Sequence, residues 1–423
     1  MQEDFLHYIW GHKKFSIAGL RTTAAKLVNI HSVGTLNSNA GPDFFNAKIN
    51  IDDQLWAGNV EIHIKSSDWY LHDHQNDKNY DNVILHVVWE HDTEIFRKDN
   101  SIIPTLELKS YVLPNAIKNY SKLFSSSGNW INCEKDFPNV DDFTIGNWLE
   151  RLYFERLEQK ATIIFQQLET LNQDWEAVLF KMLAKNFGLK VNADAFFSMA
   201  SSFDFSVLRK SQSKIEHLEA LLFGQAGLLE DNMEAPYYNS IKTEYHFLRN
   251  KFALSNALVI TPSFFRLRPS NFPTIRLSQL ANLYHKHKNL VSNVLEAKSI
   301  EAIYKLFTVG VSGFWKQHYT FSKASKPSTK IISKTFIDLL IINTIIPLKF
   351  CYAKSVGKSA VNEILNIIEA ISPEKNNIVE KFNTLNPVTK HALHSQALLQ
   401  LKNEYCNTHR CLKCAIGHKL LTQ

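Results

Sequence analysis

The chain has 423 residues, a length that favours two or three domains. Hydrophobic residues make up 45% of it and aromatic residues 12%, which argues against intrinsic disorder. The net charge of +6 is uneven, because residues 1–140 carry 13 basic and 17 acidic side chains whereas the remainder carries 34 and 24. An acidic segment beside a basic one suits a metal-using site next to an anion-binding surface, although ordinary solubility charge explains it equally well.

The N-terminal residues predict no secretory signal, because Glu3 and Asp4 interrupt them and no apolar run follows. The longest apolar run, residues 336–352, contains Asp338 and Lys349 and therefore predicts a buried helix rather than a membrane span. We expect a soluble, cytoplasmic protein with no membrane partner. Five cysteines are too few for a disulfide scaffold, and Cys351 in the apolar run is expected in the core.

The hydrophobic pattern of the first 125 residues predicts a mixed α/β module. Residues 4–14 suit a short aromatic helix, and residues 22–33 are β-rich. Alternating apolar residues predict strands at 44–51 and 55–65, joined by a turn at 52–54. A polar, helix-compatible segment at 68–80 precedes the apolar run 83–89, which predicts a buried central strand, and 103–108 predicts another strand.

Beyond a predicted linker at residues 125–128, apolar residues recur at helical spacing. The expected helices cover residues 143–171, 175–186, 215–229, 245–253, 277–284, 299–307, 334–346, 360–370 and 389–405. The predicted organisation is therefore an α/β module at 1–125, a larger all-helical domain at 126–405 and a cysteine-containing tail at 406–423.

Two acidic residues of the α/β module are the main candidates for chemistry. Residues two apart on a strand share a face, so Glu61, His63 and Lys65 point the same way, and an antiparallel neighbour would bring Asp43 beside them. Two carboxylates suit Mg²⁺ or Mn²⁺, which acidifies water, and a nearby cation stabilises transition-state charge. Alternatively, Asp43 caps a turn and Glu61 is a solvated strand residue.

Histidines and further acids follow this pattern closely. His72 and His74 form a His-X-His spacing, which is common among metal ligands, and Asp68 and Asp77 flank them. His86 lies inside the apolar strand, where a single histidine is more often a core residue. We predict that these five residues support a polar active or binding site.

The same residues resemble the motif of the PD-(D/E)XK nuclease superfamily. Pro42-Asp43 enters one predicted strand, and Glu61-Ile62-His63 lies on the next. The resemblance implies a restriction-endonuclease-like fold in which Asp43 and Glu61 hold a divalent metal. His63 stands in the position of the motif's lysine, so either Lys65 or His63 would handle water and charge. The similar pair Glu107 and Lys109 lacks neighbouring histidines and ranks lower.

The wider chain resembles a bacterial domain-of-unknown-function family, catalogued as family 2851. The resemblance rests on GPDFFNAKI, GNVEIHIKSSDW, YDNVILHVVWEHD and PTLEL, and later on FWKQHYTF, LLIINTIIPLKF and the terminal cysteine segment. It implies no activity, so a function has to be argued from the residues.

The tail contains three cysteines in the pattern Cys406-X4-Cys411-X2-Cys414. With Cys133 as the fourth ligand, they predict a Zn²⁺ or Fe–S site, which would pack the tail against the segment after the α/β module. His409 or His418 would serve equally well by ligand type. The alternative is three reduced, partly buried thiols.

A basic loop contains Arg266, Arg268 and Arg276 among phenylalanines, a composition that suits phosphate pairing and base stacking. It suits equally a loop anchored by its phenylalanines with solvated arginines. The leading hypothesis is a metal-dependent nuclease or phosphodiesterase acting on nucleic acid. The alternatives are an inactive nucleic-acid-binding protein of the same fold and a non-enzymatic metal-binding scaffold.

Overall fold

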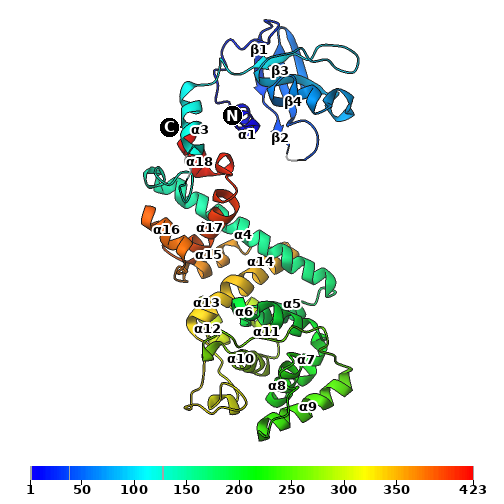
Figure 1. The fold of residues 1–423 in the computed structure, drawn as a ribbon, viewed down its shortest axis with the longest axis vertical. Helices are drawn as coiled ribbons and strands as arrows, with labels where there is room; N and C mark the ends of the chain where they lie inside the picture. Colours follow the sequence, from blue (N-terminus) through cyan, green and yellow to red (C-terminus); the bar gives the residue numbers. More distant parts are fainter. Residues whose placement is uncertain (1, 38, 126–127, 423) are drawn as a thin grey trace. The chain divides into compact units, whose positions relative to one another are not determined.

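The computed structural model describes the chain except residues 1, 38, 126–127 and 423, and divides it into two compact units (Figure 1). The sheet unit comprises Met1–Leu149, Glu380–Val388 and Leu399–Gln423, and the helical unit comprises Glu150–Val379 and Thr389–Leu398. The prediction of a mixed α/β N-terminal part followed by a larger helical region is confirmed. The predicted linker includes Ser126 and Ser127, which lie outside the described residues.

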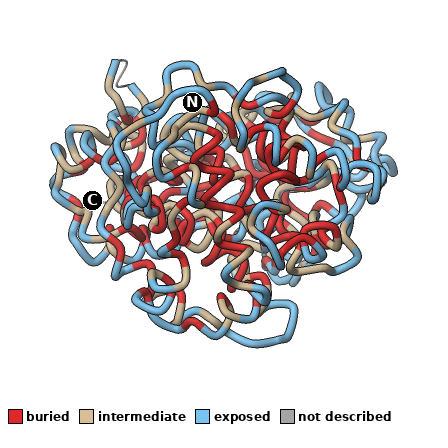
Figure 2. The backbone as a smooth tube through the Cα atoms, turned by 90° about the horizontal axis from the view of Figure 1, so that it is seen from below, coloured by how far each residue is buried: buried red, intermediate tan, exposed pale blue. Residues whose placement is uncertain are grey.

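The sheet unit contains a mixed sheet of six described strands. They are β1 (Val28–Ser32), β2 (Thr35–Leu36), β3 (Phe44–Ile51), β4 (Gln54–Lys65), β5 (Val83–Glu90) and β6 (Thr105–Glu107). The order is β1-β3-β4-β5-β6, with β2 paired to β3. The β1–β3 and β3–β4 pairs are antiparallel, whereas β4–β5 and β5–β6 are parallel. The first six residues of β5, which are apolar except for His86, are buried, as this apolar run predicts. Along the chain, buried segments lie inside and exposed segments outside (Figure 2).

Helix α1 (Glu3–Gly11) packs on this sheet because one of its faces is apolar. Phe5, Leu6, Ile9 and Trp10 are fully buried in the same core as strand residues of β3, β4 and β5. The opposite face carries polar residues, so the docking of α1 fixes the direction in which they point. The sheet unit also contains α3 (Pro114–Phe124) and α18 (Ala415–Thr422).

The boundaries between the two units fall inside α4 (Asp142–Thr170), α16 (Asn377–Leu385) and α17 (Ala392–Gln400). The helical unit further contains α5 (Trp175–Phe187), α6 (Leu189–Ser201), α7 (Phe205–Ser211), α8 (Ile215–Gln225), α9 (Pro236–Phe252), α10 (Pro273–Lys286), α11 (Leu290–Glu296), α12 (Ile300–Phe307), α13 (Lys334–Leu340), α14 (Ile346–Ser355) and α15 (Val361–Glu369). The stretch Lys334–Ser355 is long and apolar enough to cross a membrane, but 67% of its most apolar window is buried, as in the core helix of a globular protein.

Candidate metal centre

The β3–β4 hairpin brings Asp43 and Glu61 together. Phe44 pairs with Val60, so Asp43, just before β3, lies beside Glu61 on β4. The backbone N–H of Asp43 donates to Glu61 Oε2 at 3.1 Å, and the N–H of Ile62 donates to Asp43 Oδ2 at 2.9 Å. Each side chain thus accepts a hydrogen bond from the other strand, which fixes the two carboxylates close to one another.

Helix α1 adds two ligand-type residues that the sequence analysis missed. Glu3 and His7 are four residues apart and therefore share a helix face. His7 Nε2 lies 3.2 Å from Asp43 Oδ2 and 3.7 Å from Glu3 Oε1. One ligand atom from each of Glu3, His7 and Asp43 fits within 4.8 Å of the other two, a spacing that could hold a metal ion.

Three imidazoles form a second group on the other side of Glu61. His63 Nε2 lies 3.1 Å from His72 Nδ1, and one nitrogen from each of His63, His72 and His74 lies within 4.8 Å of the other two. Nitrogens that share one metal ion at about 2.1 Å lie roughly 3 to 3.5 Å apart. The distance between His63 and His72 therefore fits joint ligation of one cation.

His86 supports this group from the interior. The parallel register pairs Glu61 with His86, and His63 Nδ1 lies 2.8 Å from His86 Nε2. A metal-bound histidine commonly donates its second ring N–H to a buried partner, which fixes its tautomer and ring orientation. His86 is fully buried and holds the ring of His63 in this way.

Glu61 lies between the two groups. Its Oε1 is 3.3 Å from His74 Nε2 and 3.5 Å from His63 Nε2, while its Oε2 is on the side of Asp43. The buried Nε2 atoms of His7 and His74 have no well-directed hydrogen bond among the described residues, although each faces a carboxylate oxygen. Each of these nitrogen and oxygen atoms can present a lone pair to the same space, an arrangement that could bind a cation.

Burial dominates the electrostatics of the centre. It raises the pKa of Glu61 far above the usual carboxyl value, and the charge of Asp43 raises it further. Burial and then the neighbouring imidazoles lower the pKa of His63 to about 2, and burial lowers that of His86 to about 3. Both imidazoles are therefore neutral at physiological pH, so His63 can keep a lone pair on Nε2 for a metal while its Nδ1 bonds to His86.

The structure does not bring the other predicted acids and the lysine into this centre. Lys65 is exposed, and among the described residues its ammonium contacts neither Asp43 nor Glu61. Asp68 Oδ2 accepts the backbone N–H of Lys65 at 2.9 Å, and Asp77 Oδ1 accepts that of Asn79 at 2.9 Å. These acids shape the loop that carries His72 and His74 rather than contributing ligand atoms.

Two further predicted sets lie elsewhere. Glu107 Oε2 accepts the backbone N–H of His91 at 3.1 Å, away from the histidines of the centre. In the helical unit, Arg266 and Arg268 are exposed, whereas Arg276 is 7% exposed and bonds to Gln279 and Asn271. Burial lowers the pKa of Arg276 to about 10. Arg276 is therefore buried and does not share the solvent exposure of Arg266 and Arg268. Its guanidinium packs over the ring of Phe336 in the core.

The four predicted metal-binding cysteines, Cys133, Cys406, Cys411 and Cys414, all line one cavity of the sheet unit. Neither alternative histidine joins them. His409 is exposed, and His418 Nδ1 lies 3.2 Å from Tyr8 Oη instead.

The comparison with known families gives one match. The model of the family described as "Protein of unknown function (DUF2851)" matches residues 3–377. That range contains every histidine and carboxylate of the metal centre but ends before the three cysteines of the tail. No curated protein and no solved structure matches the chain.

Proposed function

We propose that this chain, which belongs to the family described as "Protein of unknown function (DUF2851)", is a divalent-metal-dependent nuclease or phosphodiesterase. One observation carries the proposal: the buried Glu61 carboxylate lies between two groups of ligand atoms. The first group is Glu3, His7 and Asp43, and the second is His63, His72 and His74. Such an arrangement suits one or two cations that share a carboxylate.

The donor types favour Mn²⁺ over Mg²⁺. Mg²⁺ prefers oxygen ligands and retains several waters, whereas imidazole nitrogens suit transition metals. Asp43 and Glu61 would supply negative charge, and the histidines would supply neutral nitrogen ligands. When bound, the cation acidifies water and offsets charge on a phosphoryl group.

The protein's own groups would orient and complete this site. His86 holds the ring of His63, and the N–H of Ile62 holds one oxygen of Asp43. His7 Nε2 lies 3.2 Å from Asp43 Oδ2, so this basic group takes the place next to the carboxylates that the sequence assigned to Lys65. When it is not itself bound to the cation, an imidazole beside a carboxylate can accept or return a proton near neutral pH.

Two features support a phosphodiester substrate and a restriction-endonuclease-like arrangement. Pro42-Asp43 enters β3 and Glu61-Ile62-His63 lies on its partner β4, the order that the PD-(D/E)XK resemblance implies. The exposed Arg266 and Arg268 suit a polyanion, since guanidinium groups pair with phosphate.

The test is cleavage by the full-length chain. Labelled single-stranded DNA, duplex DNA and RNA are incubated with Mn²⁺, and we expect nicking of at least one substrate that a chelator abolishes. Asp43→Asn and Glu61→Gln should reduce the rate by at least about 100-fold. The matched control is Glu107→Gln, which alters an acid of the same sheet outside the centre. Cleavage that persists in both centre variants would overturn the proposal.

The replacement of the motif's lysine by His63 favours a second candidate, a metal-bound protein that binds nucleic acid without cutting it. It predicts Mn²⁺ binding and salt-dependent nucleic-acid binding with no cleavage of any substrate. Mn²⁺ binding without any affinity for nucleic acid would instead indicate a metal-binding scaffold.

A further inference from the structure

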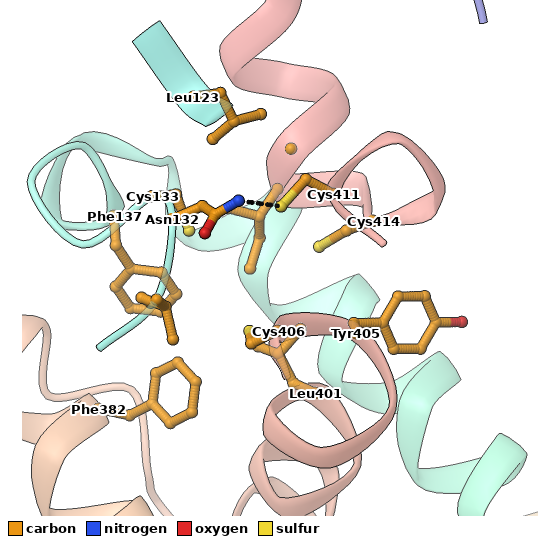
Figure 3. Close-up of a pocket in the computed structure, with 13 residues that line it drawn as sticks. Leu123, Asn132, Cys133, Phe137, Phe382, Leu401, Tyr405, Cys406, Cys411 and Cys414 are labelled. Carbon is orange, nitrogen blue, oxygen red and sulfur yellow. Dashed lines mark hydrogen bonds between the residues drawn. The ribbon is translucent and has the colours of Figure 1, made fainter. Parts of the chain in front are cut away.

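Four cysteines from two distant parts of the sequence meet in the sheet unit. Cys133 lies in the turn that follows α3, and Cys406 ends a π-helical turn, Leu401–Cys406. Cys411 and Cys414 lie on the tight turn before α18, where the N–H of Cys414 donates to the carbonyl of Cys411 at 3.2 Å. Figure 3 shows the four side chains around one common space.

The turn that carries Cys411 and Cys414 requires a glycine. A Cβ atom at Gly417 would lie 2.0 Å from the carbonyl oxygen of Cys411, far inside van der Waals contact. Gly417 therefore lets the first turn of α18 close over the Cys411–Cys414 turn. This close packing holds the two thiols on the same side of the tail.

The cavity between the thiols is apolar apart from sulfur and one amide. Phe137, Phe382 and Leu401 line it, and all four thiols are free rather than paired in disulfides. Asn132 Nδ2 donates to Cys411 Sγ at 3.5 Å, the kind of contact that stabilises a metal-bound thiolate (Figure 3). An apolar pocket lined by four thiols resembles the surroundings of buried metal–sulfur centres.

We propose that Cys133, Cys406, Cys411 and Cys414 bind an iron–sulfur cluster. A single zinc ion with Zn–S bonds of 2.3 Å would hold four sulfurs roughly 3.8 Å apart. Among the residues described, the groups of three ligand atoms within 4.8 Å of one another all belong to the carboxylate–imidazole centre, and the thiols do not form one. Sulfurs spread around a cavity suit a cluster, in which the thiolates bind different irons.

Ligation would link two separate segments of the sheet unit. A preassembled cluster transferred from the thiolates of a carrier would exchange its four Fe–S bonds to the carrier for four Fe–S bonds to these cysteines. The four thiol protons would pass to the released carrier thiolates, and no electrons would be transferred. The cluster would then join the turn after α3 to the C-terminal tail. Because 272 residues separate Cys133 from Cys406 in sequence, this crosslink would close a long loop of the unfolded chain and stabilise the native arrangement of the tail.

The test uses the full-length chain produced with sufficient iron and purified without oxygen. We expect a brown protein with broad visible absorption, and iron and acid-labile sulfide in equal amounts. Cys133→Ala and Cys411→Ala should each lower the iron content at least about tenfold. The control Cys351→Ala removes a buried thiol of the helical unit and should leave the iron content unchanged.

Two results would overturn the cluster. One is a colourless protein with one zinc per chain and no sulfide. The other is wild-type protein that contains neither metal and takes up no iron and sulfide on anaerobic reconstitution. Both are measured on the wild-type chain, so poor folding of a cysteine variant does not affect them. Neither depends on nuclease activity, so this inference and the proposed function can fail separately.

Discussion

The sheet unit and the helical unit each bury a glutamate, but the two are surrounded differently. Glu219 on α8 is 1% exposed, and three hydroxyl groups donate to it: Ser278 at 2.6 Å, Tyr237 at 2.5 Å and Ser312 at 2.9 Å. Glu61 is 4% exposed, and it faces the Asp43 carboxylate and neutral imidazoles instead.

Their neighbours distinguish Glu219, a carboxyl group with a structural role, from Glu61, a candidate functional one. Both oxygens of Glu219 have a donor, so its hydrogen bonds offset part of the cost of burial. Glu61 receives one backbone N–H, and its other neighbours are two imidazole nitrogens and the Asp43 carboxylate, which are ligand types that a cation would bring together. Burial of a carboxylate is therefore a weak sign of function, and the type of its neighbours is a stronger one.

The largest expected effect is on metal affinity. Replacing both Asp43 and Glu61 by alanine removes the two central carboxylates, and we expect Mn²⁺ affinity to fall about 1,000-fold, or about 4 kcal/mol. Isothermal titration of the full-length chain measures it. Glu219→Gln should bind Mn²⁺ as wild type does, and equal loss in the control would remove the distinction between the two glutamates.

The pH dependence of stability should reveal Glu219. Burial raises its pKa to about 7, against 4.5 in the unfolded chain. Between these values the unfolded chain releases a proton that the folded protein keeps, so the free energy of unfolding falls as the pH rises from about 4.5 to about 7. The loss amounts to about 3 kcal/mol and is complete above pH 7. Urea unfolding at several pH values measures it.

Glu219→Gln keeps the shape of the side chain and removes its titration. Its unfolding free energy should therefore change less with pH than that of wild type over the same interval. A variant as pH-sensitive as wild type would assign the dependence to other groups.

Local pattern predicted every described strand except the short β2, and it predicted the approach of Asp43 to Glu61, because alternation and a short hairpin fix register. It did not predict Glu3 and His7, since the docking of α1 on the sheet depends on non-local packing. The only sequence sign of them was a Glu-X3-His spacing opposite buried aromatics. The exposure of Lys65 was missed for a related reason. Side chains on the same face of a strand point the same way, but this does not show which of them are buried and which reach solvent.

A smaller effect is expected at His86, which contacts His63 rather than the two carboxylates. His86→Ala leaves the ring of His63 without its partner at 2.8 Å, and loss of such a partner typically costs 10- to 100-fold in metal affinity. We expect a reduction of about 30-fold in Mn²⁺ affinity. His86→Gln retains a polar group and should recover part of the loss, whereas equal binding by His86→Ala and wild type would exclude a positioning role.

The smallest effect is expected at Lys65, which the sequence placed with the carboxylates. Its side chain is exposed and, within the described part of the chain, its ammonium forms no ion pair with Asp43 or Glu61, so Lys65→Ala should change Mn²⁺ affinity by less than about twofold. His7→Ala is the informative partner, because His7 Nε2 lies 3.2 Å from Asp43 Oδ2 and should account for a larger loss. If Lys65→Ala instead weakens Mn²⁺ binding more than His7→Ala does, the ammonium of Lys65 reaches the metal centre in solution. Lys65 on β4, rather than His7, would then be the basic group of the site.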